Sequence, residues 1–224
     1  MRVHDVEPRT PPWCDLRRPR VGSTDAKAVT STRRNGAETA ARRDLRTRIA
    51  LSRLDVQIED PMFSNADTER GIRLEPIAIR YLELSRSMRI SPVGYVSHDT
   101  LYAGVSPDGH IDGTAGAVEI KAPRPSNQVS AFRLADAHTG LEAVPAPYRM
   151  QLVHHLCVDT SRAYVIWASF CEEMPPPLQL LTHTIKRESI PDQLSEYTEA
   201  LTGFCGEVDQ EIAILSSLIK RQSV

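Results

Sequence analysis

Residues 104–121 read Gly-Val-Ser-Pro-Asp-Gly-His-Ile-Asp-Gly-Thr-Ala-Gly-Ala-Val-Glu-Ile-Lys, and this stretch decides the predicted fold. At its end, apolar side chains alternate with the charged residues Glu119 and Lys121, which is the period of a strand with one buried face. Glu119 and Lys121 then point to the same side of the strand, roughly 6 to 7 Å apart. Asp108 lies eleven residues before Glu119, with three glycines between them, so a hairpin can bring the two carboxylates together.

Two carboxylates and one ammonium on a single sheet face suit metal-assisted hydrolysis of a phosphodiester. Carboxylate oxygens are the hard ligands that Mg²⁺ prefers, and a bound metal activates water and neutralises charge in the transition state. A lysine beside them can orient the water or stabilise that charge. The alternative is an exposed hairpin whose Glu119 and Lys121 form only a surface salt bridge.

The residues of this stretch also form motifs that resemble those of a known family. Pro107-Asp108 followed by Glu119-Ile120-Lys121 resembles the core motif of the PD-(D/E)xK nucleases. With Ser106, Gly109 and the later Pro123 included, it resembles more narrowly the phage lambda exonuclease group, the YqaJ-type viral recombinase nucleases. The resemblance covers roughly residues 13–170. It implies an α/β fold with a restriction-endonuclease-like core, in which helices flank a central mixed sheet.

The resemblance implies roles for the residues of the hairpin. Asp108 and Glu119 would bind Mg²⁺ together with the carbonyl of Ile120, and Mn²⁺ would be able to substitute. Lys121 would position or activate the attacking water. Asp112 is the alternative to Asp108 in this role, although a turn residue before Gly113 is the simpler interpretation of Asp112.

A second acidic residue, Glu75, lies within a helical pattern over residues 68–82. Its neighbours are apolar, and an unpaired carboxylate among them would be costly. The sequence therefore predicts that Glu75 meets either an arginine or a metal. The wording Gly-x-x-x-Glu-Pro, from Gly71 to Pro76, resembles the family helix whose glutamate joins the metal site and takes part in catalysis.

Residues 147–158 predict another helix, with Gln151 near its middle. Gln151 resembles the family glutamine that contacts the catalytic lysine or the scissile phosphate. Relatives often have a tyrosine three or four residues later, where this chain has His154 and His155. Adjacent residues on a helix point about 100° apart, so the two histidines are not expected to bind one metal ion together, and their roles stay open.

The segment from Trp13 to Ala26 reads as a turn into a helix. Ser23 or Thr24 can cap that helix, and a helix N-terminus with a hydroxyl and a nearby arginine also binds anions. The segment resembles the opening motif of the family, which holds the 5′-phosphate of the DNA end. The resemblance assigns phosphate binding to Arg17, with Ser23 or Thr24 beside it.

With 224 residues and 41% hydrophobic content, the chain can bury one core, which favours a single nuclease domain over residues 1–224. We expect a flexible polar arm at residues 1–12 and an amphipathic C-terminal helix at residues 190–222. The four cysteines form no Cys-x-x-Cys pair, which argues against a structural zinc or an iron–sulfur cluster. No apolar run suits a membrane span or a secretory signal, so we expect a cytoplasmic protein, phage-encoded or bacterial, without a membrane partner.

The charge distribution is uneven. Residues 1–53 contain 13 Lys or Arg and 6 Asp or Glu, whereas the remainder contains 14 and 23. A basic N-terminal part can contact phosphates. The resemblance then implies an exonuclease that degrades one strand of linear double-stranded DNA from its ends, 5′ to 3′, in phage-type recombination. It also implies a homotrimer and a single-strand annealing protein as partner. The alternatives are a PD-(D/E)xK endonuclease and a catalytically inactive DNA-binding module.

Overall fold

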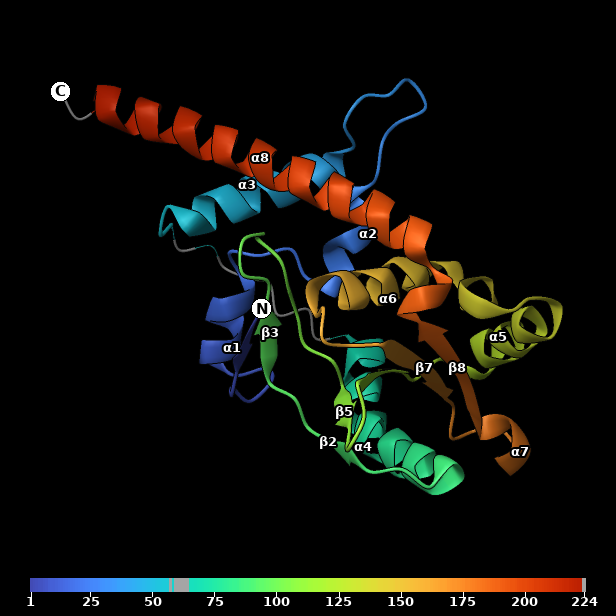
Figure 1. Ribbon diagram of the computed structural model, residues 1–224. Coiled ribbons are helices and arrows are strands. Elements are labelled where there is room, and N and C mark those ends of the chain that lie inside the picture. Colours follow the sequence, from blue (N-terminus) through green and yellow to red (C-terminus); the bar gives the residue numbers. More distant parts are fainter. Residues whose placement is uncertain (57, 59–64, 223–224) are drawn as a thin grey trace.

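The structure is a computed structural model that describes residues 1–56, 58 and 65–222 (Figure 1). Its centre is a five-stranded mixed sheet in the order β2-β5-β6-β7-β8. Neighbouring strands are antiparallel, except for β6 and β7, which are parallel. The strands are β2 (Ile90–Ser91), β5 (Gly109–Ile111), β6 (Gly116–Lys121), β7 (Tyr164–Phe170) and β8 (Leu180–Lys186). Helices flank this sheet, which confirms the predicted α/β fold class.

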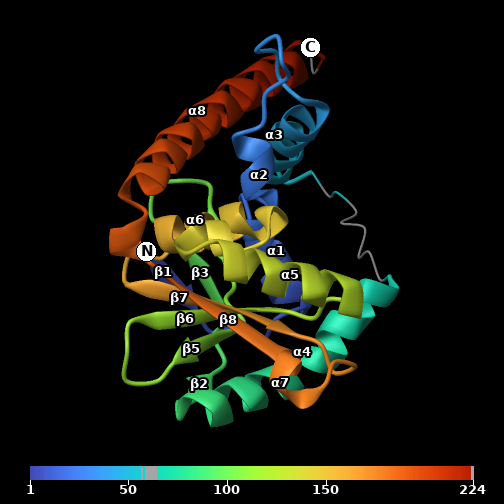
Figure 2. The same ribbon diagram turned by 90° about the vertical axis from the view of Figure 1, so that its right-hand side faces the viewer.

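The parallel pair requires a crossover, because two parallel strands cannot be joined by a tight turn. The crossover contains α5 (Pro125–Ala137), the 3₁₀ turn η2 (Gly140–Ala143) and α6 (Ala146–Val158). Figure 2 shows α5 and α6 on one side of the sheet and α4 (Ala66–Arg86) on the other. The short α7 (Pro176–Gln179) connects β7 to β8.

The alternating pattern of β6 separates the two apolar layers of the protein. Val118 and Ile120 pack in a cluster with Leu74, Ala78 and Leu82 of α4. The opposite face of β6 and β7 packs against α6, in a larger cluster that includes Ala117, Trp167, Leu152 and Leu156. Glu119 and Lys121 belong to this second face, so their charged groups lie between the sheet and α6. Helix α6 therefore covers these two side chains.

Helix α4 contains a proline in its interior but runs unbroken. The helix begins after Asn65, whose Oδ1 accepts hydrogen bonds from the backbone N–H of Asp67 at 3.0 Å and of Thr68 at 2.8 Å. Pro76 lies in mid-helix, where its ring removes one backbone donor, so it neither starts nor ends the element. The buried positions recur every fourth residue and hold the helix on the sheet. They are Arg70, Leu74, Ala78 and Leu82.

A second layer of helices lies beyond α6. The long α8 (Pro191–Gln222) runs beside α3 (Ala40–Arg53), and Figure 1 shows the two crossing the top of the molecule. Arg42 of α3 contacts Glu207 of α8 through its two terminal guanidinium nitrogens, Nη1 at 2.5 Å and Nη2 at 3.0 Å. The remaining short helical elements of the protein are α1 (Pro11–Arg17), the 3₁₀ turn η1 (Ser23–Asp25), α2 (Ala26–Val29) and the 3₁₀ turn η3 (Arg187–Ser189).

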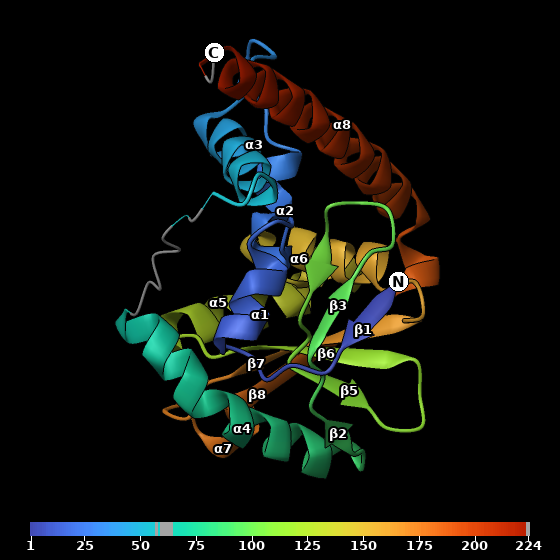
Figure 3. The ribbon, with the colours of Figure 1, turned by 90° about the vertical axis from the view of Figure 1, so that its left-hand side faces the viewer.

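The N-terminal residues differ from the flexible arm expected over residues 1–12. Residues Arg2–His4 form β1, which pairs with β3 (Tyr95–Ser97), and β3 pairs in turn with β4 (Gly104–Val105). Figure 3 shows this three-stranded sheet beside α1. Gly94 makes the approach possible, since a Cβ there would lie 2.1 Å from the carbonyl oxygen of His4. Composition alone does not reveal such a long-range pairing. No helix among the described residues is long and apolar enough to cross a membrane.

We predict that Gly104→Ala lowers the free energy of unfolding by about 1–3 kcal/mol, the usual effect of overpacking a core. A Cβ at Gly104 would lie 1.9 Å from the hydroxyl oxygen of Tyr95, a side chain that is 1% exposed. Urea denaturation followed by circular dichroism measures the change. The control is Gly206→Ala in α8, where a Cβ meets nothing within 4 Å. That change should stabilise the helix by roughly 0.5–1 kcal/mol, and equal effects of both substitutions would contradict the prediction.

Candidate active site

The hairpin of β5 and β6 brings Asp108 beside Glu119. Gly109 lies opposite Val118 in the antiparallel register, so Asp108 falls next to Glu119 across the two strands. The backbone N–H of Asp108 donates to the carbonyl of Val118 at 3.0 Å. Its carboxylate Oδ2 accepts the backbone N–H of Ile120 at 2.6 Å. Both the main chain and the side chain of Asp108 are therefore fixed on the end of β6.

Glu119 and Lys121 lie on one face of β6, as their spacing predicts. Lys121 Nζ is 2.5 Å from Glu119 Oε1, and Glu119 has only 7% of its side chain exposed. The Lys121 ammonium also lies 5.4 Å from the ring centroid of Tyr148 on α6. Glu119 and Lys121 therefore form a buried ion pair beside an aromatic ring. They do not form the exposed surface salt bridge that the sequence allowed as an alternative.

Glu75 approaches the same place from α4, on the other side of the sheet. Its Oε2 lies 2.7 Å from Nη2 of Arg9, so of the two partners that the sequence allowed, the structure provides an arginine. Arg9 adopts a φ of 68°, in the left-handed region that a non-glycine residue rarely occupies. Glu75 also lies close enough to Asp108 for its negative charge to contribute to the raised pKa of Asp108.

The two central carboxylates have opposite electrostatic environments. Burial raises the pKa of Asp108 well above its ordinary value, and the charges of Glu119 and Glu75 raise it further. Burial also acts to raise the pKa of Glu119, but the charges of Lys121 and His155 outweigh it and lower the pKa to about 2. Burial acts to lower the pKa of Lys121, whereas Glu119 and Asp108 raise it more strongly. The site therefore holds an ionised glutamate beside a carboxyl group that resists ionisation without a further cation.

Gln151 lies on the face of α6 that looks toward these residues, one helical turn after Tyr148. Its Oε1 is buried and has no hydrogen-bond partner among the described residues. The structure does not bring Gln151 into a hydrogen bond with Lys121. A buried amide oxygen without a partner is uncommon and is consistent with a group that becomes bonded only when a ligand is present.

His155 is the residue of this site that sequence analysis did not assign. Its Nε2 lies 3.1 Å from Glu119 Oε2, and its side chain is 2% exposed. The neighbouring His154 points elsewhere, with Nδ1 at 2.7 Å from the Tyr197 hydroxyl and Nε2 at 3.0 Å from the Gly104 carbonyl. The signal in the sequence was positional: His155 follows Gln151 by one helical turn on the inner face of α6.

The side chains at this point fit a divalent cation by their chemistry. Asp108, Glu119, Glu75 and the Ile120 carbonyl offer hard oxygen donors. No group of three or more His, Cys, Asp or Glu side chains is already arranged around one metal position within the part of the chain that the structure describes. Instead, Lys121 and Arg9 contact the carboxylates of Glu119 and Glu75. Burial, and after it the charges of Glu119 and Glu75, raise the pKa of Asp108, and a bound cation would favour the ionised form.

The proposed 5′-phosphate residues connect to this site through Trp13. Its Nε1 donates to Ser106 Oγ at 3.2 Å, and Ser106 lies two residues before Asp108. The Arg17 guanidinium stacks over the Trp13 ring at 4.2 Å from the centroid. Arg17 also lies beside the η1 turn, because a Cβ built on Gly22 would be 3.7 Å from its Nη2.

Ser23 and Thr24 do not cap a helix, contrary to one interpretation of the sequence. Both lie within η1, whose N-cap is Gly22, and the Gly22 N–H donates to Asp25 Oδ2 at 3.0 Å. Asp25, three residues after the cap, therefore accepts the N–H of the cap residue, which is the bond that the side chain at this position makes in a capping box. Asp112, the alternative to Asp108, lies in the exposed turn at the opposite end of the hairpin.

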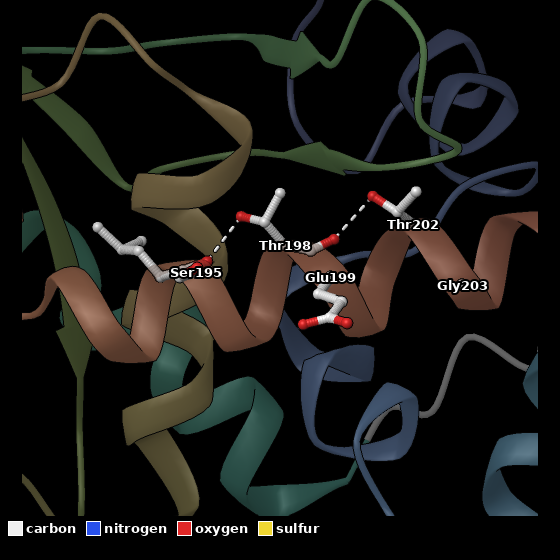
Figure 4. Close-up of a pocket in the computed structure, with 6 residues that line it drawn as sticks. Ser195, Thr198, Glu199, Thr202 and Gly203 are labelled. Atoms are coloured by element: carbon white, nitrogen blue, oxygen red, sulfur yellow. Dashed lines mark hydrogen bonds between the residues drawn. The ribbon is translucent and has the colours of Figure 1, made fainter.

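A hollow of about 660 Å³ on the outer face of α8 is separate from these residues (Figure 4). Its threonine hydroxyls donate to the backbone of their own helix, Thr198 to Leu194 at 2.6 Å and Thr202 to Thr198 at 2.8 Å. Glu199 is its single charged lining residue. This hollow lacks the converging charged groups that catalysis on a phosphate requires.

We predict that Asp108→Asn raises the melting temperature of the metal-free protein at neutral pH. The raised folded-state pKa of Asp108 means that its favourable contribution is complete below the unfolded value of about 4 and is lost as the pH rises toward the folded value. Asparagine keeps an oxygen for the Ile120 N–H without the charge. Thermal denaturation in EDTA should show a gain at pH 8 that shrinks toward pH 4. Asp112→Asn in the exposed turn is the control and should leave the melting temperature unchanged at both pH values. An equal gain for Asp108→Asn at pH 8 and pH 4 would contradict the prediction, because the gain would then not come from the charge of Asp108.

Comparison with known proteins places the chain in a family. A model of the YqaJ-like viral recombinase domain matches residues 12–162. The fold is similar to that of an alkaline exonuclease, LHK-Exo, from Laribacter hongkongensis, with 22% identity, a TM-score of 0.78, and coverage of 95% of this chain and 100% of that one. Its complex with dAMP gives 23% identity, a TM-score of 0.79 and the same coverage.

A phage-related exonuclease from Haemophilus somnus 129PT is also similar, with 14% identity, a TM-score of 0.62, and coverage of 88% of this chain and 96% of that one. At these identities, the solved structures establish the shared fold. No curated protein matches the chain at a significant level. The family model spans more than half of the chain and confirms the resemblance predicted from Ser106–Gly109 and Glu119–Lys121. The chain belongs to the YqaJ-like viral recombinase family.

Proposed function

We propose that this protein is a metal-dependent exonuclease that hydrolyses phosphodiester bonds of linear double-stranded DNA. The observation that carries the proposal is the buried juxtaposition of Asp108 and Glu119 with the Lys121 ammonium 2.5 Å from the glutamate. A purely structural sheet gains little from charged groups buried at this depth, because their desolvation is costly. Family membership and the exonuclease-like fold support the same reaction class.

Mg²⁺ is the proposed cofactor, with Mn²⁺ as a substitute. Asp108, Glu119 and the Ile120 carbonyl would hold it, and Glu75 would contribute once its carboxylate is released from Arg9. When bound, the ion supplies Lewis-acid stabilisation of the phosphate and lowers the pKa of a coordinated water. The carboxylates would then be neutralised by the ion, so Lys121 would no longer be needed as the counterion of Glu119.

Lys121 and Gln151 would act on the water and the phosphate. The Lys121 ammonium, held near the Tyr148 ring, would orient the attacking water and stabilise charge that develops on the phosphate oxygens. Gln151, whose Oε1 lacks a partner among the described residues, would accept a hydrogen bond from Lys121 or donate through its amide nitrogen to the scissile phosphate. Beside them, a hollow of about 410 Å³ is lined by Tyr148 and Ser169, among others, and offers room for a nucleotide.

The end of the DNA would be held by Arg17, with Ser23 or Thr24 beside it. Arg17 lies over Trp13, and Trp13 bonds to Ser106 just before Asp108, so the anchor and the acidic site share one framework. An anchor for a 5′-phosphate next to the cleavage site favours digestion in the 5′ to 3′ direction. We further propose that the protein works as a homotrimer and delivers its single-stranded product to an annealing protein in phage-type recombination.

Digestion of linear and closed-circular duplex DNA, with Mg²⁺ and with EDTA, tests the proposed reaction. Loss of a 5′ label from linear DNA only, and only with Mg²⁺, is the expected result. Nicking or cutting of circles would identify an endonuclease instead, and the absence of any cleavage would favour an inactive binding module.

We predict that Glu119→Gln and Lys121→Ala each reduce cleavage at least about 100-fold, since each removes charge that acts on the transition state. Initial rates on linear DNA at saturating Mg²⁺ measure this. Lys186→Ala is the matched control, because Lys186 also lies at the end of a strand but is 62% exposed. Wild-type rates in either Glu119→Gln or Lys121→Ala would refute the site.

We predict that Arg17→Ala removes the preference for 5′-phosphorylated ends. A charge-assisted hydrogen bond is worth about 1.5–3 kcal/mol, which corresponds to roughly 10- to 160-fold. The measurement compares digestion of 5′-phosphate and 5′-hydroxyl ends by each variant. Arg34→Ala, an exposed arginine in the same N-terminal part, should keep the preference. If wild-type protein digests both ends equally, Arg17 does not have this role.

A further inference from the structure

Helix α6 carries two adjacent histidines that face different surroundings. His154 has both ring nitrogens bonded, one to the Tyr197 hydroxyl and one to the Gly104 carbonyl. His155 points about 100° away around the helix and reaches Glu119. One histidine therefore joins α6 to α8 and β4, and the other joins α6 to the end of β6.

The position of His155 is set by its helix. Leu152 and Leu156, on either side of it along α6, are fully buried against the sheet. The imidazole itself is 2% exposed, and its Nδ1 has no hydrogen-bond partner among the described residues. Nε2 makes no aligned hydrogen bond either, and a buried polar ring without a partner is costly. Glu119 Oε2, at 3.1 Å from Nε2, is the partner within its reach.

The contact complements that of Lys121. Lys121 Nζ lies 2.5 Å from Glu119 Oε1, while His155 Nε2 lies 3.1 Å from Glu119 Oε2. The ring is at hydrogen-bond distance, although it is not aligned as a hydrogen bond here, and a small rotation would align it. The two oxygens of one carboxylate are thus contacted from two elements, the strand itself and the helix above it.

These contacts have different consequences when a cation arrives. Lys121 is needed for the water or the phosphate, so its contact with Glu119 must weaken. His155 has no such second task, and the packing of α6 keeps it in place. A metal ligand generally needs an outer partner that fixes its orientation, and loss of such a partner typically weakens metal binding 10- to 100-fold.

We propose that His155 is a positioning residue that holds the Glu119 carboxylate in the orientation required to bind the divalent cation. This inference rests on the proposed function of the acidic site. His155 donates from Nε2 to Glu119 Oε2, fixes the glutamate rotamer, and leaves the remaining lone pairs of the carboxylate for the metal. Lys121 is thereby free to leave Oε1 without loss of the glutamate orientation.

The test compares two substitutions of His155 with one of His154. His155→Leu fills the space without a donor, and His155→Gln restores an N–H near the position of Nε2. His154→Leu is the matched control, because it removes two buried hydrogen bonds on the same helix without touching Glu119. Mn²⁺ binding in the absence of DNA is measured from the electron paramagnetic resonance signal of the free ion. The Mg²⁺ concentration for half-maximal cleavage and the melting temperature are measured for the same proteins.

We expect His155→Leu to weaken Mn²⁺ binding and to raise the half-saturating Mg²⁺ concentration, each about tenfold or more. His155→Gln should stay within about threefold of wild type for both. His154→Leu should lower the melting temperature but leave Mn²⁺ affinity unchanged when measured well below that temperature. This pattern separates a role at Glu119 from general support of the helix.

Wild-type Mn²⁺ affinity in His155→Leu would overturn the inference, as would an equal loss of affinity in His155→Gln and His155→Leu. A loss of affinity in His154→Leu as large as in His155→Leu would also overturn it, because the effect would then be structural. Glu119→Gln distinguishes failure of the inference about His155 from failure of the proposed function. If wild type binds Mn²⁺ and cleaves DNA while Glu119→Gln does neither, the proposed function stands whatever His155 does. If wild type and Glu119→Gln bind Mn²⁺ equally, the acidic site is not the metal site and both conclusions fall.

Discussion

The hydrogen bond from the Ile120 N–H to the Asp108 carboxylate is the interaction on which the site depends. It fixes the side chain of one strand on the backbone of the next, directly beside Glu119. Two carboxyl groups are thereby held together in a buried place. Burial first, and the neighbouring carboxylate charges second, raise the pKa of Asp108. The β5–β6 hairpin thus stores an electrostatic cost that a divalent cation can relieve, which links the local backbone geometry to the chemistry.

Two helices from opposite sides of the sheet complete the site. Each helix packs apolar side chains against the sheet and presents polar side chains to the site. Helix α4 buries Leu74 and Ala78 against the sheet and presents Glu75 at its edge. Helix α6 buries its leucines and presents Tyr148, Gln151 and His155 toward β6. The apolar contacts are non-directional, but they fix the helices closely enough for the polar groups to meet at defined distances. The packing of these two helices on the sheet therefore also places the polar groups of the site.

The N-terminal segment contributes to the same place, although it lies far away along the chain. Trp13 bonds to Ser106 and stacks beneath Arg17, and Arg9 pairs with Glu75. The pairing of β1 with β3 holds the start of the chain against the body. The basic excess of the first 53 residues is thus partly directed at the acidic site, and partly at α8, where Arg42 and Arg46 meet Glu207.

The sequence by itself determined the fold class, the hairpin, and the placement of Glu119 with Lys121, because strand period and glycine-rich turns are local signals. Its motifs also identified Asp108, Glu75 and Gln151 as candidate site residues. Only the tertiary structure decided that Arg9 meets Glu75, that residues 2–4 form a strand, and that His155 rather than His154 reaches Glu119. The contact of Arg9 with Glu75 joins residues 66 positions apart, β1 pairs with a strand that lies far along the chain, and the contact of His155 depends on the rotation of a packed helix. Such relations arise from the docking of whole elements, and no local pattern of residues encodes that docking.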